Sequence, residues 1–411
     1  MAVDLIVRNA RLVGSAEGDP PVDIAVEAGR IVAVEPDFAG DGEAVDAGGK
    51  LVSPPLIETH IHLDKSRILD RCAPSPDRGT DHMLRVSAVK EGFTVEDVYR
   101  RAAETIEGCV MHGTSHMRTH VEIDPNGGMR GFEALMQLKK DYAWALDLEL
   151  CVFAQEGLTN CPETDANLVD GLKRGATVIG GAPGYDPDHA GQIRRIFDLA
   201  REFDVDVDIH LDVGPDPDTL DIWLVCELAE KYGWQGRTAV GHAAKYSLLP
   251  PDRLKEVGRR MAAAGVAVEV LPTTDLFVMG RNHDHAVPRG VTDAHALGAC
   301  GVNCALSTNN VLNPFTPFGD CSLTRMACLY SNIVQRGALE EMAEAFQMMT
   351  ANSARLMRKA DYGVAVGHPA DFVLWNVATP AEAVATVAHP LTAFKRGRRV
   401  FTRPLPELHR P

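Results

Sequence analysis

Two kinds of hydrophobic pattern divide the chain. Near both ends, in residues 2–55 and 370–404, apolar residues alternate with polar ones and glycines interrupt the runs, as in "DIAVEAGRIVAVE" (23–35). This alternation, together with many β-branched residues, indicates short strands with one buried face. Because the two strand-rich segments stand at opposite ends of the chain, we predict that they combine into one small β-domain.

The middle of the chain alternates short apolar runs, typical of buried strands, with longer amphipathic segments, typical of helices. Helices are predicted over 94–113, 189–204, 220–233 and 251–265. A doubly wound sheet would also alternate in this way, but no GxGxxG opens any of these helices. The predicted strands are 56–64, 113–123, 148–158, 175–185, 204–213, 237–244, 265–275 and 301–310.

Eight strands alternating with helices over about 300 residues are what a (β/α)8 barrel requires. We therefore predict an α/β protein with a TIM-type barrel over residues 56–355. A small β-sandwich domain is predicted from both chain ends, residues 1–55 plus 356–411.

The composition indicates which binding partners and which cellular compartment to expect. The 41 basic and 57 acidic residues give a net charge of −16, which argues against nucleic acid or an anionic membrane as a partner. The chain has no run of about 18 apolar residues and no signal-peptide pattern at its start. The nine cysteines are scattered without a CxxC pair, which favours reduced thiols. We expect a soluble cytoplasmic protein.

Histidines stand at several predicted strand ends, which converge at one mouth of a barrel. His60 and His62 in "THIHLD" are two residues apart and so share a face. His210 in "DIHLD" and His242 in "VGHAA" follow later strands, and we treat His120 in "RTHVE" as a hydrogen-bonded core residue. Two inward histidines are costly to bury without a ligand, and histidine is the commonest ligand of catalytic divalent metals. The sequence therefore predicts a metal site.

The same motifs carry a family resemblance. "ETHIHLDKS", "CVFAQEGL", "DIHLDVG", "VGHAA" and "LFVMGRNHDHAVPRGVTDAHALGACGVN" resemble the cytosine-deaminase-like branch of the amidohydrolase superfamily. The resemblance spans nearly the whole chain, including the closing "GHPADFVLWN". An HxH pair alone is common, but the pair combined with QEG, IHLD and GH at the right strand ends is specific.

The resemblance implies roles for five residues. His60, His62 and His210 match metal ligands, and His242 matches the histidine beside the metal-bound water or the substrate. Gln155 matches a glutamine that holds the ring edge of a heterocyclic substrate, since an amide both donates and accepts; alternatively, it is a strand-end residue bonded to backbone. We expect one divalent metal ion, zinc, with iron or manganese as alternatives. No lysine in "LELCVFAQEGLTN" could bridge a second metal.

Two positions depart from the family pattern. Members place a glutamate three residues beyond the strand-five histidine, where this chain has Val213. Members also end strand eight with an aspartate that ligates the metal and takes a proton, and the match of "NNVLNPFTPFG" puts Asn309 there. Asparagine can ligate through its carbonyl oxygen or hold water, but it cannot take a proton. Both proton carriers of the deaminase mechanism are therefore missing.

The absence of these two acids affects protonation of the leaving group more than it affects attack by water. A metal lowers the pKa of its bound water to about 7 without a carboxylate base, whereas general acid–base help to a departing amine is typically about 10²–10⁴-fold. Asp212, two residues beyond His210, is our preferred replacement acid, and His242 is the best general acid or base. Lys65 either reaches an anionic substrate group or is a solvated loop charge. The other acids at predicted strand ends are Asp64, Glu156 and Asp275, of which the last fits a solvated loop nearly as well.

Three functional hypotheses follow. The first is a metal-dependent hydrolase of a C–N bond in a small cyclic amide, imide or amino-heterocycle, in which ring opening or a weakly basic leaving group compensates for the missing acids. The second is a non-catalytic small-molecule-binding protein on the same barrel, and the third is a metal-dependent isomerase or lyase. Retention of the histidines and Gln155 favours the enzyme. We expect a small N-heterocyclic substrate and, from the family, a homo-oligomer.

Overall fold

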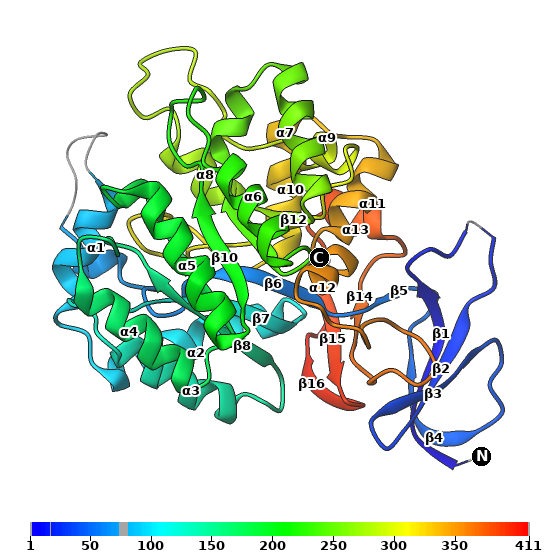
Figure 1. Ribbon diagram of the computed structural model, residues 1–411. Coiled ribbons are helices and arrows are strands. Elements are labelled where there is room, and N and C mark those ends of the chain that lie inside the picture. Colours follow the sequence, from blue (N-terminus) through cyan, green and yellow to red (C-terminus); the bar gives the residue numbers. More distant parts are fainter. Residues whose placement is uncertain (1, 17, 74–80, 410–411) are drawn as a thin grey trace.

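The computed structural model describes residues 2–16, 18–73 and 81–409. Helices surround one sheet of parallel strands, and a second strand-rich unit stands at one side of it (Figure 1). The predicted combination of a (β/α)8 barrel with a smaller β-unit is confirmed.

Eight parallel strands form the barrel in chain order, each paired with the next. The barrel closes between its first and last strands through an Ile61–Asn309 bridge, with the Asn309 amide 2.8 Å from the His60 carbonyl oxygen. Each predicted strand overlaps an observed one. The strands are β6 (Leu56–Ile61), β7 (Thr114–Glu122), β8 (Asp147–Ala154), β9 (Val178–Gly181), β10 (Asp206–Leu211), β11 (Thr238–His242), β12 (Val266–Val270) and β13 (Cys304–Leu306). Strand β8 begins one residue before the predicted run.

Helices of the barrel pack their apolar faces on these strands, and one continuous core results. The four predicted helices correspond to α2, α5, α6 and α7. The α-helices are α1 (His82–Lys90), α2 (Val95–Met111), α3 (Arg130–Asp141), α4 (Pro162–Lys173), α5 (His189–Phe203), α6 (Ile222–Tyr232), α7 (Pro251–Ala263), α8 (Pro272–Val278), α9 (Ala294–Gly298), α10 (Leu323–Val334), α11 (Leu339–Gln347), α12 (Ala351–Leu356) and α13 (Pro380–Ala385). Short 3₁₀ helices are η1 (Leu69–Arg71), η2 (Pro183–Tyr185) and η3 (Ala244–Leu248).

One segment differs from its predicted structure. The run 265–275 is predicted as a single strand, but β12 ends at Val270 and α8 begins at Pro272. Proline lacks an amide hydrogen and has a fixed φ, so it suits the first position of a helix and not a ladder. As a result, Asp275 lies on a helix that crosses the barrel mouth and not at a strand end.

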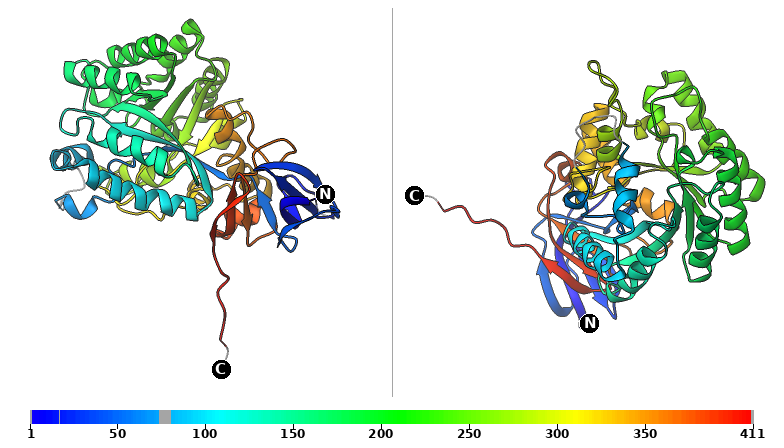
Figure 2. Two further views of the ribbon diagram at one scale, coloured as in Figure 1. Left: turned by 90° about the horizontal axis from the view of Figure 1, so that it is seen from below. Right: turned by 90° about the vertical axis from the view of Figure 1, so that its left-hand side faces the viewer.

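The second unit combines both ends of the chain into one sheet, in the order β16–β15–β14–β5–β1–β2–β3, with β4 also paired to β1. Its apolar side chains enclose a separate small core that includes Val7, Ile24, Phe372 and Phe394. Residues 403–409, after β16, extend away from the body (Figure 2). The strands are β1 (Ala2–Leu12), β2 (Val22–Glu27), β3 (Arg30–Glu35), β4 (Asp41–Asp46), β5 (Leu51–Ser53), β14 (Phe372–Trp375), β15 (Pro390–Lys395) and β16 (Arg398–Thr402).

We propose that the two folding units have the limits 56–355 and 1–55 plus 356–411, because β6 begins at Leu56 and α12 ends at Leu356. Among the described helices, none is both long and apolar enough to cross a membrane. The nine cysteines are free thiols.

Candidate active site

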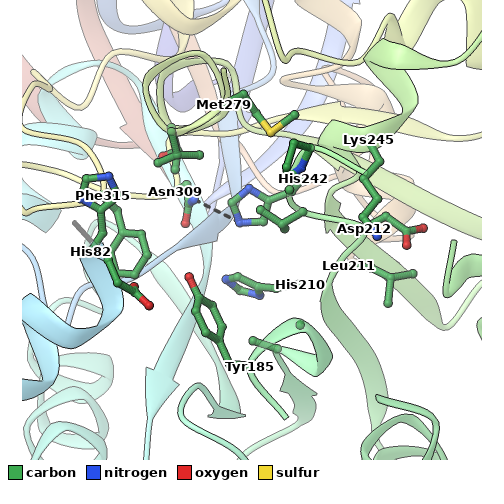
Figure 3. Close-up of a pocket in the computed structure, with 18 of the residues that line it drawn as sticks. His82, Tyr185, His210, Leu211, Asp212, His242, Lys245, Met279, Asn309 and Phe315 are labelled. Atoms are coloured by element: carbon green, nitrogen blue, oxygen red, sulfur yellow. Dashed lines mark hydrogen bonds between the residues drawn. The ribbon is translucent and has the colours of Figure 1, made fainter. Parts of the chain in front are cut away.

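A pocket of about 310 Å³ opens at the C-terminal ends of the barrel strands. Its walls come from the ends of β8 to β11, from α1 and α8, and from the loop after β13 (Figure 3). In (β/α)8 proteins this face is where strand ends present polar side chains to ligands. The floor includes His62, His210 and His242.

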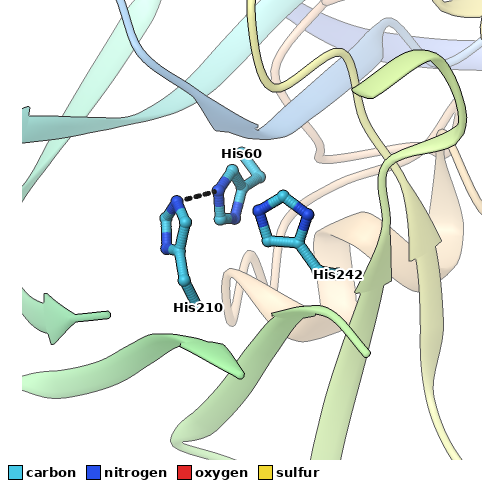
Figure 4. A group of neighbouring side chains, drawn as sticks. All are labelled: His60, His210 and His242. Atoms are coloured by element: carbon cyan, nitrogen blue, oxygen red, sulfur yellow. Dashed lines mark hydrogen bonds between the residues drawn. The ribbon is translucent and has the colours of Figure 1, made fainter. Parts of the chain in front are cut away.

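Three of the predicted ligand histidines meet beneath this pocket. The Nε2 atom of His210 lies 3.1 Å from Nε2 of His60 and 2.9 Å from Nε2 of His62. Figure 4 shows His60, His210 and His242 turned toward one another from three strands. Burial keeps the pKa of His60, His62 and His210 well below its usual value, so these three imidazoles are neutral donors of lone pairs.

Buried acids hold His60 in place from below. Its Nδ1 atom lies 2.7 Å from Oε2 of Glu269 on β12, and Asp208 Oδ1 lies 3.8 Å away. His120 is buried as predicted; its ring stacks on His60 at 3.9 Å and its Nε2 lies 3.2 Å from Asp208 Oδ1. A proton shared between Glu269 and His60 Nδ1 leaves Nε2 of His60 free to face the other histidines.

The donor set fits a divalent metal. Nitrogens bound to one zinc ion at about 2.0–2.1 Å stand about 3.3 Å apart in a tetrahedron, close to the 3.1 and 2.9 Å that separate Nε2 of His210 from Nε2 of His60 and of His62. One ring nitrogen from each of His60, His210 and His242 also lies within 4.8 Å of the other two. Buried beside these nitrogens, Oδ1 of Asn309 has no hydrogen-bond partner in the described structure. Three neutral imidazoles are typical of catalytic zinc and also suit iron, and the carbonyl oxygen of Asn309 is a donor of the kind that manganese prefers.

Three residues at strand ends adopt a left-handed backbone. The φ angle is 72° at His242, 64° at Asn309 and 50° at Asp212. Non-glycine residues rarely adopt positive φ, although His, Asn and Asp do so most often, and such strain gathers at functional sites. In this conformation the backbone of Asn309 closes the barrel, and its side chain faces His242. The Nδ2 atom of Asn309 lies 3.4 Å from Nε2 of His242.

His242 has a buried carboxylate behind it. Its Nδ1 donates to Oδ1 of Asp275 at 2.6 Å, and Asp275 is fully buried. This contact fixes the proton on Nδ1 and leaves Nε2 facing Asn309 in the pocket as an acceptor. The alternative prediction, that Asp275 is a solvated loop acid, is therefore wrong. The sequence pattern did not predict α8, the helix on which Asp275 is buried.

Asp212 lies at the pocket wall with both carboxylate oxygens engaged. Oδ1 accepts the Asp221 amide at 2.8 Å and Oδ2 accepts the Tyr246 hydroxyl at 2.9 Å. Burial raises the pKa of Asp212 to about 6. Val213, where the family places a glutamate, lies at the rim with 40% of its surface exposed.

Gln155 and Lys65 form a polar corner of the pocket. The Lys65 ammonium donates to Glu122 and, at 3.4 Å, to Oε1 of Gln155. Lys65 is only 1% exposed, so the solvated-loop interpretation of this residue is wrong. Because Oε1 of Gln155 accepts from the lysine, its amide nitrogen is left as a donor toward the pocket. The Gln155 backbone amide donates to Asp124 at 3.1 Å, which anchors the strand end.

A second buried lysine supports this corner. Lys90 of α1 contacts Glu122 and also lies 2.7 Å from Oε1 of Glu156 and 3.4 Å from Oδ2 of Asp124. Glu122 therefore bridges two ammonium groups, and although burial opposes it, these lysines hold the pKa of Glu122 below its usual value. Sequence analysis did not identify Glu122, Lys90 or Glu269 as site residues. A charged residue that stands alone in an apolar run could have indicated such a site residue, as Glu269 does in "VAVEVL".

Known proteins resemble this chain in sequence and in fold. A family model described as "Amidohydrolase family" matches residues 99–401. The chain is 28% identical to N-isopropylammelide isopropyl amidohydrolase of Pseudomonas sp. (strain ADP), with 96% of each chain covered. It is 26% identical to pterin deaminase of Rhizobium rhizogenes, over 96% of this chain and 90% of the other. The solved structure of 5-methylcytosine deaminase from Klebsiella pneumoniae matches with a TM-score of 0.92 and 27% identity, covering 99% of both chains.

Proposed function

This chain belongs to the amidohydrolase family, and from that premise we propose that it is a metal-dependent hydrolase of a C–N bond in a small amino-heterocycle. The supporting observation is that Nε2 of His210 lies within 3.1 Å of Nε2 of both His60 and His62, beneath the pocket. Gln155 and the Asp275-bonded His242 also line this pocket. Similarity to enzymes named for an ammelide, a pterin and a methylcytosine supports the same substrate class.

We propose that His60, His62 and His210 hold one divalent ion, zinc in the first place, with Asn309 Oδ1 beside it. Such an ion supplies Lewis acidity, which brings the pKa of a bound water to about 7. The hydrolysis adds water across the C–N bond and releases ammonia or an amine, leaving an oxo group on the ring.

In this proposal, His242 transfers the proton. Its Nε2 faces the pocket and can accept the proton of the attacking water, while Asp275 stabilises the imidazolium that forms. The imidazolium can then deliver that proton to the departing nitrogen, which is the step for which the family's glutamate and aspartate are absent here. Asp212, engaged with Tyr246 and the Asp221 amide, shapes the wall on the same side.

In this proposal, Gln155 and Lys65 in the polar corner orient the substrate. Gln155 presents its amide N–H and Lys65 its ammonium, so this edge of the pocket offers hydrogen-bond donors. A ring that bears a carbonyl oxygen or an unprotonated ring nitrogen matches them. We therefore propose an oxo-substituted amino-heterocycle, an aminopyrimidinone or a larger relative, as the substrate class.

The retained dyad argues against the binding-protein alternative. A protein that only binds a ring has no use for a buried Asp275 that fixes the tautomer of His242 at 2.6 Å. Burying that carboxylate lowers the stability of the folded protein, and a role in proton transfer gives a reason for keeping it.

Metal content of the protein as purified, measured by elemental mass spectrometry, tests the proposal. We expect about one equivalent of zinc, iron or manganese. His60→Ala should lose the metal and all hydrolysis of aminopyrimidinones, whereas His285→Ala, on the surface, should keep both. A protein that stays metal-free after incubation with these ions, or a metal-free His60→Ala that retains full activity, would refute the assignment.

A further inference from the structure

The outer part of the pocket contains a histidine that the proposed chemistry does not use. His82, the first residue of α1, lines the pocket with 8% of its surface exposed (Figure 3). Neither of its ring nitrogens has a hydrogen-bond partner in the described structure. Buried polar groups are nearly always paired, so two unpartnered nitrogens on a side chain that lines a pocket indicate a ligand.

Aromatic rings from two other elements flank His82. Its ring centroid lies 5.9 Å from that of Phe315, in the loop after β13, and 5.7 Å from that of Phe277 on α8. Phe315 also lies 4.4 Å from the Lys65 ammonium. Only one aromatic ring thus separates His82 from the polar corner, and Tyr185 lines the same pocket. Planar rings pack favourably against such faces and edges.

His82 offers one donor and one acceptor at neutral pH. Burial, followed by the charges of Arg281 and Arg85, lowers the pKa of this histidine to about 4. A neutral imidazole can donate from one nitrogen and accept at the other. This pairing matches the nitrogens and oxygens of a second heterocyclic ring better than it matches a charged or purely apolar group.

The space available agrees with a ligand larger than one ring. The pocket of about 310 Å³ lies at the lower end of the range of about 300–1,000 Å³ typical of drug-sized ligands.

We propose that His82 and Phe315 form a second-ring subsite, so that the substrate is a fused bicyclic amino-heterocycle whose outer ring stacks on Phe315 and hydrogen-bonds to His82. This inference rests on the proposed function and specifies its substrate class. The inner ring, held by Gln155 and Lys65, carries the C–N bond that is hydrolysed.

A matched pair of compounds tests the subsite. Pterin is isocytosine fused to a pyrazine ring, and hydrolysis of their amino groups gives lumazine and uracil, respectively. Calorimetry of the metal-loaded protein should show lumazine binding at least about tenfold tighter than uracil. The same preference should appear in kcat/KM for pterin over isocytosine.

Substitution of His82 separates the subsite from the catalytic centre. His82→Ala should remove the lumazine advantage and leave uracil binding within about twofold of wild type. His82→Asn, which keeps a donor and an acceptor, should retain part of the advantage. His285→Ala, an exposed histidine, is the matched control and should change neither.

Different failures have different meanings. If uracil and lumazine bind equally, or if His82→Ala weakens both alike in a protein that still hydrolyses isocytosine, the subsite is refuted and the proposed function stands. If the metal-loaded protein neither binds nor hydrolyses any of the four compounds, the proposed function and the subsite are both refuted.

Discussion

The contact between His242 and Asp275 is the residue-scale feature on which a proton path depends. A lone imidazole could carry its proton on either nitrogen, whereas the 2.6 Å contact places the proton on Nδ1 and turns Nε2 to the pocket. In the proposed mechanism, the carboxylate also stabilises the charged imidazole. In the same mechanism, His242 with Asp275 takes the place of the proton carriers that Val213 and Asn309 cannot provide.

Asp275→Asn should therefore lower kcat by about 10²-fold or more, because an amide no longer fixes the tautomer or stabilises the imidazolium. We expect KM to change little and the metal content to stay the same, since Asp275 touches none of His60, His62 and His210. Steady-state kinetics together with elemental analysis measures both. Asp284→Asn, on an exposed side chain, is the control; an unchanged kcat in Asp275→Asn would remove the dyad from the mechanism.

Asn309 is the second feature at this scale. Its Oδ1 is buried without a partner and its Nδ2 lies 3.4 Å from His242 Nε2. A carboxylate at this position would add a negative charge beside the three imidazoles without altering the left-handed backbone, which Asp also tolerates.

We expect Asn309→Asp to slow loss of the metal to a chelator by about tenfold, because groups around a metal change its affinity by about 10- to 100-fold. Deamination of aminopyrimidinones should rise if the missing acid limits the rate. Asn332→Asp adds the same charge on the surface and should do neither. Faster metal loss in Asn309→Asp would show that the amide is the better neighbour.

At the scale of elements, loops between strands and helices hold the pocket walls. Asp186, after η2, joins two of these loops: its Oδ2 accepts the amides of Leu158 at 2.6 Å and Thr159 at 2.9 Å, and its Oδ1 accepts that of Asp188 at 3.0 Å. Burial alone would raise the pKa of Asp186, but a hydrogen bond from the Thr159 hydroxyl, together with these backbone amides, lowers it to about 2. The ionised form is therefore bound more strongly in the folded protein.

Since the folded pKa lies below the ordinary value of 3.8, this stabilisation is present above about pH 4 and is lost as the pH falls toward 2. Asp186→Asn should lower the free energy of unfolding by about 2 kcal/mol at pH 7. The difference from wild type should shrink below pH 4, as measured by urea unfolding. Asp198→Asn, on the exposed face of α5, should leave stability unchanged; a difference that persists undiminished at low pH would contradict the ionic explanation.

At the scale of the whole molecule, a buried cation joins the β-unit to the barrel. Lys395 at the end of β15 is 2% exposed, and its ammonium lies 2.7 Å from Asp147 of β8 and 3.2 Å from Asp371. It also donates to the Ser115 carbonyl at 3.4 Å. The contacts lie at the opposite end of β8 from Gln155, so the β-unit supports the barrel away from the chemistry.

Lys395→Met keeps much of the side-chain volume but leaves the buried Asp371 without its cation, whereas the half-buried Asp147 keeps Arg396 at 3.4 Å. Breaking a buried ion pair in this way costs about 3–5 kcal/mol, so the melting temperature should fall markedly. The metal content of the folded protein should be unchanged. Lys173→Met, at an exposed position of α4, is the control; equal melting temperatures for the two variants would mean that Lys395 does not hold the units together.

The sequence by itself determined the barrel and the converging histidines. A two-residue period places His60 and His62 on one face, and parallel strands bring their C-terminal ends to one mouth, so the proximity of both to His210 follows from local pattern. The composite β-unit is likewise visible in alternation at both ends of the chain.

Only the tertiary structure decided which acid stands behind His242. Asp275 is 33 positions away on a helix that the pattern predicts as a strand, and its burial depends on how α8 crosses the barrel mouth. The burial of Lys65 and the free nitrogens of His82 depend in the same way on side chains from distant elements. Local periodicity encodes which face of an element is buried, whereas the partner of a buried charge is set by packing between elements that the sequence leaves far apart.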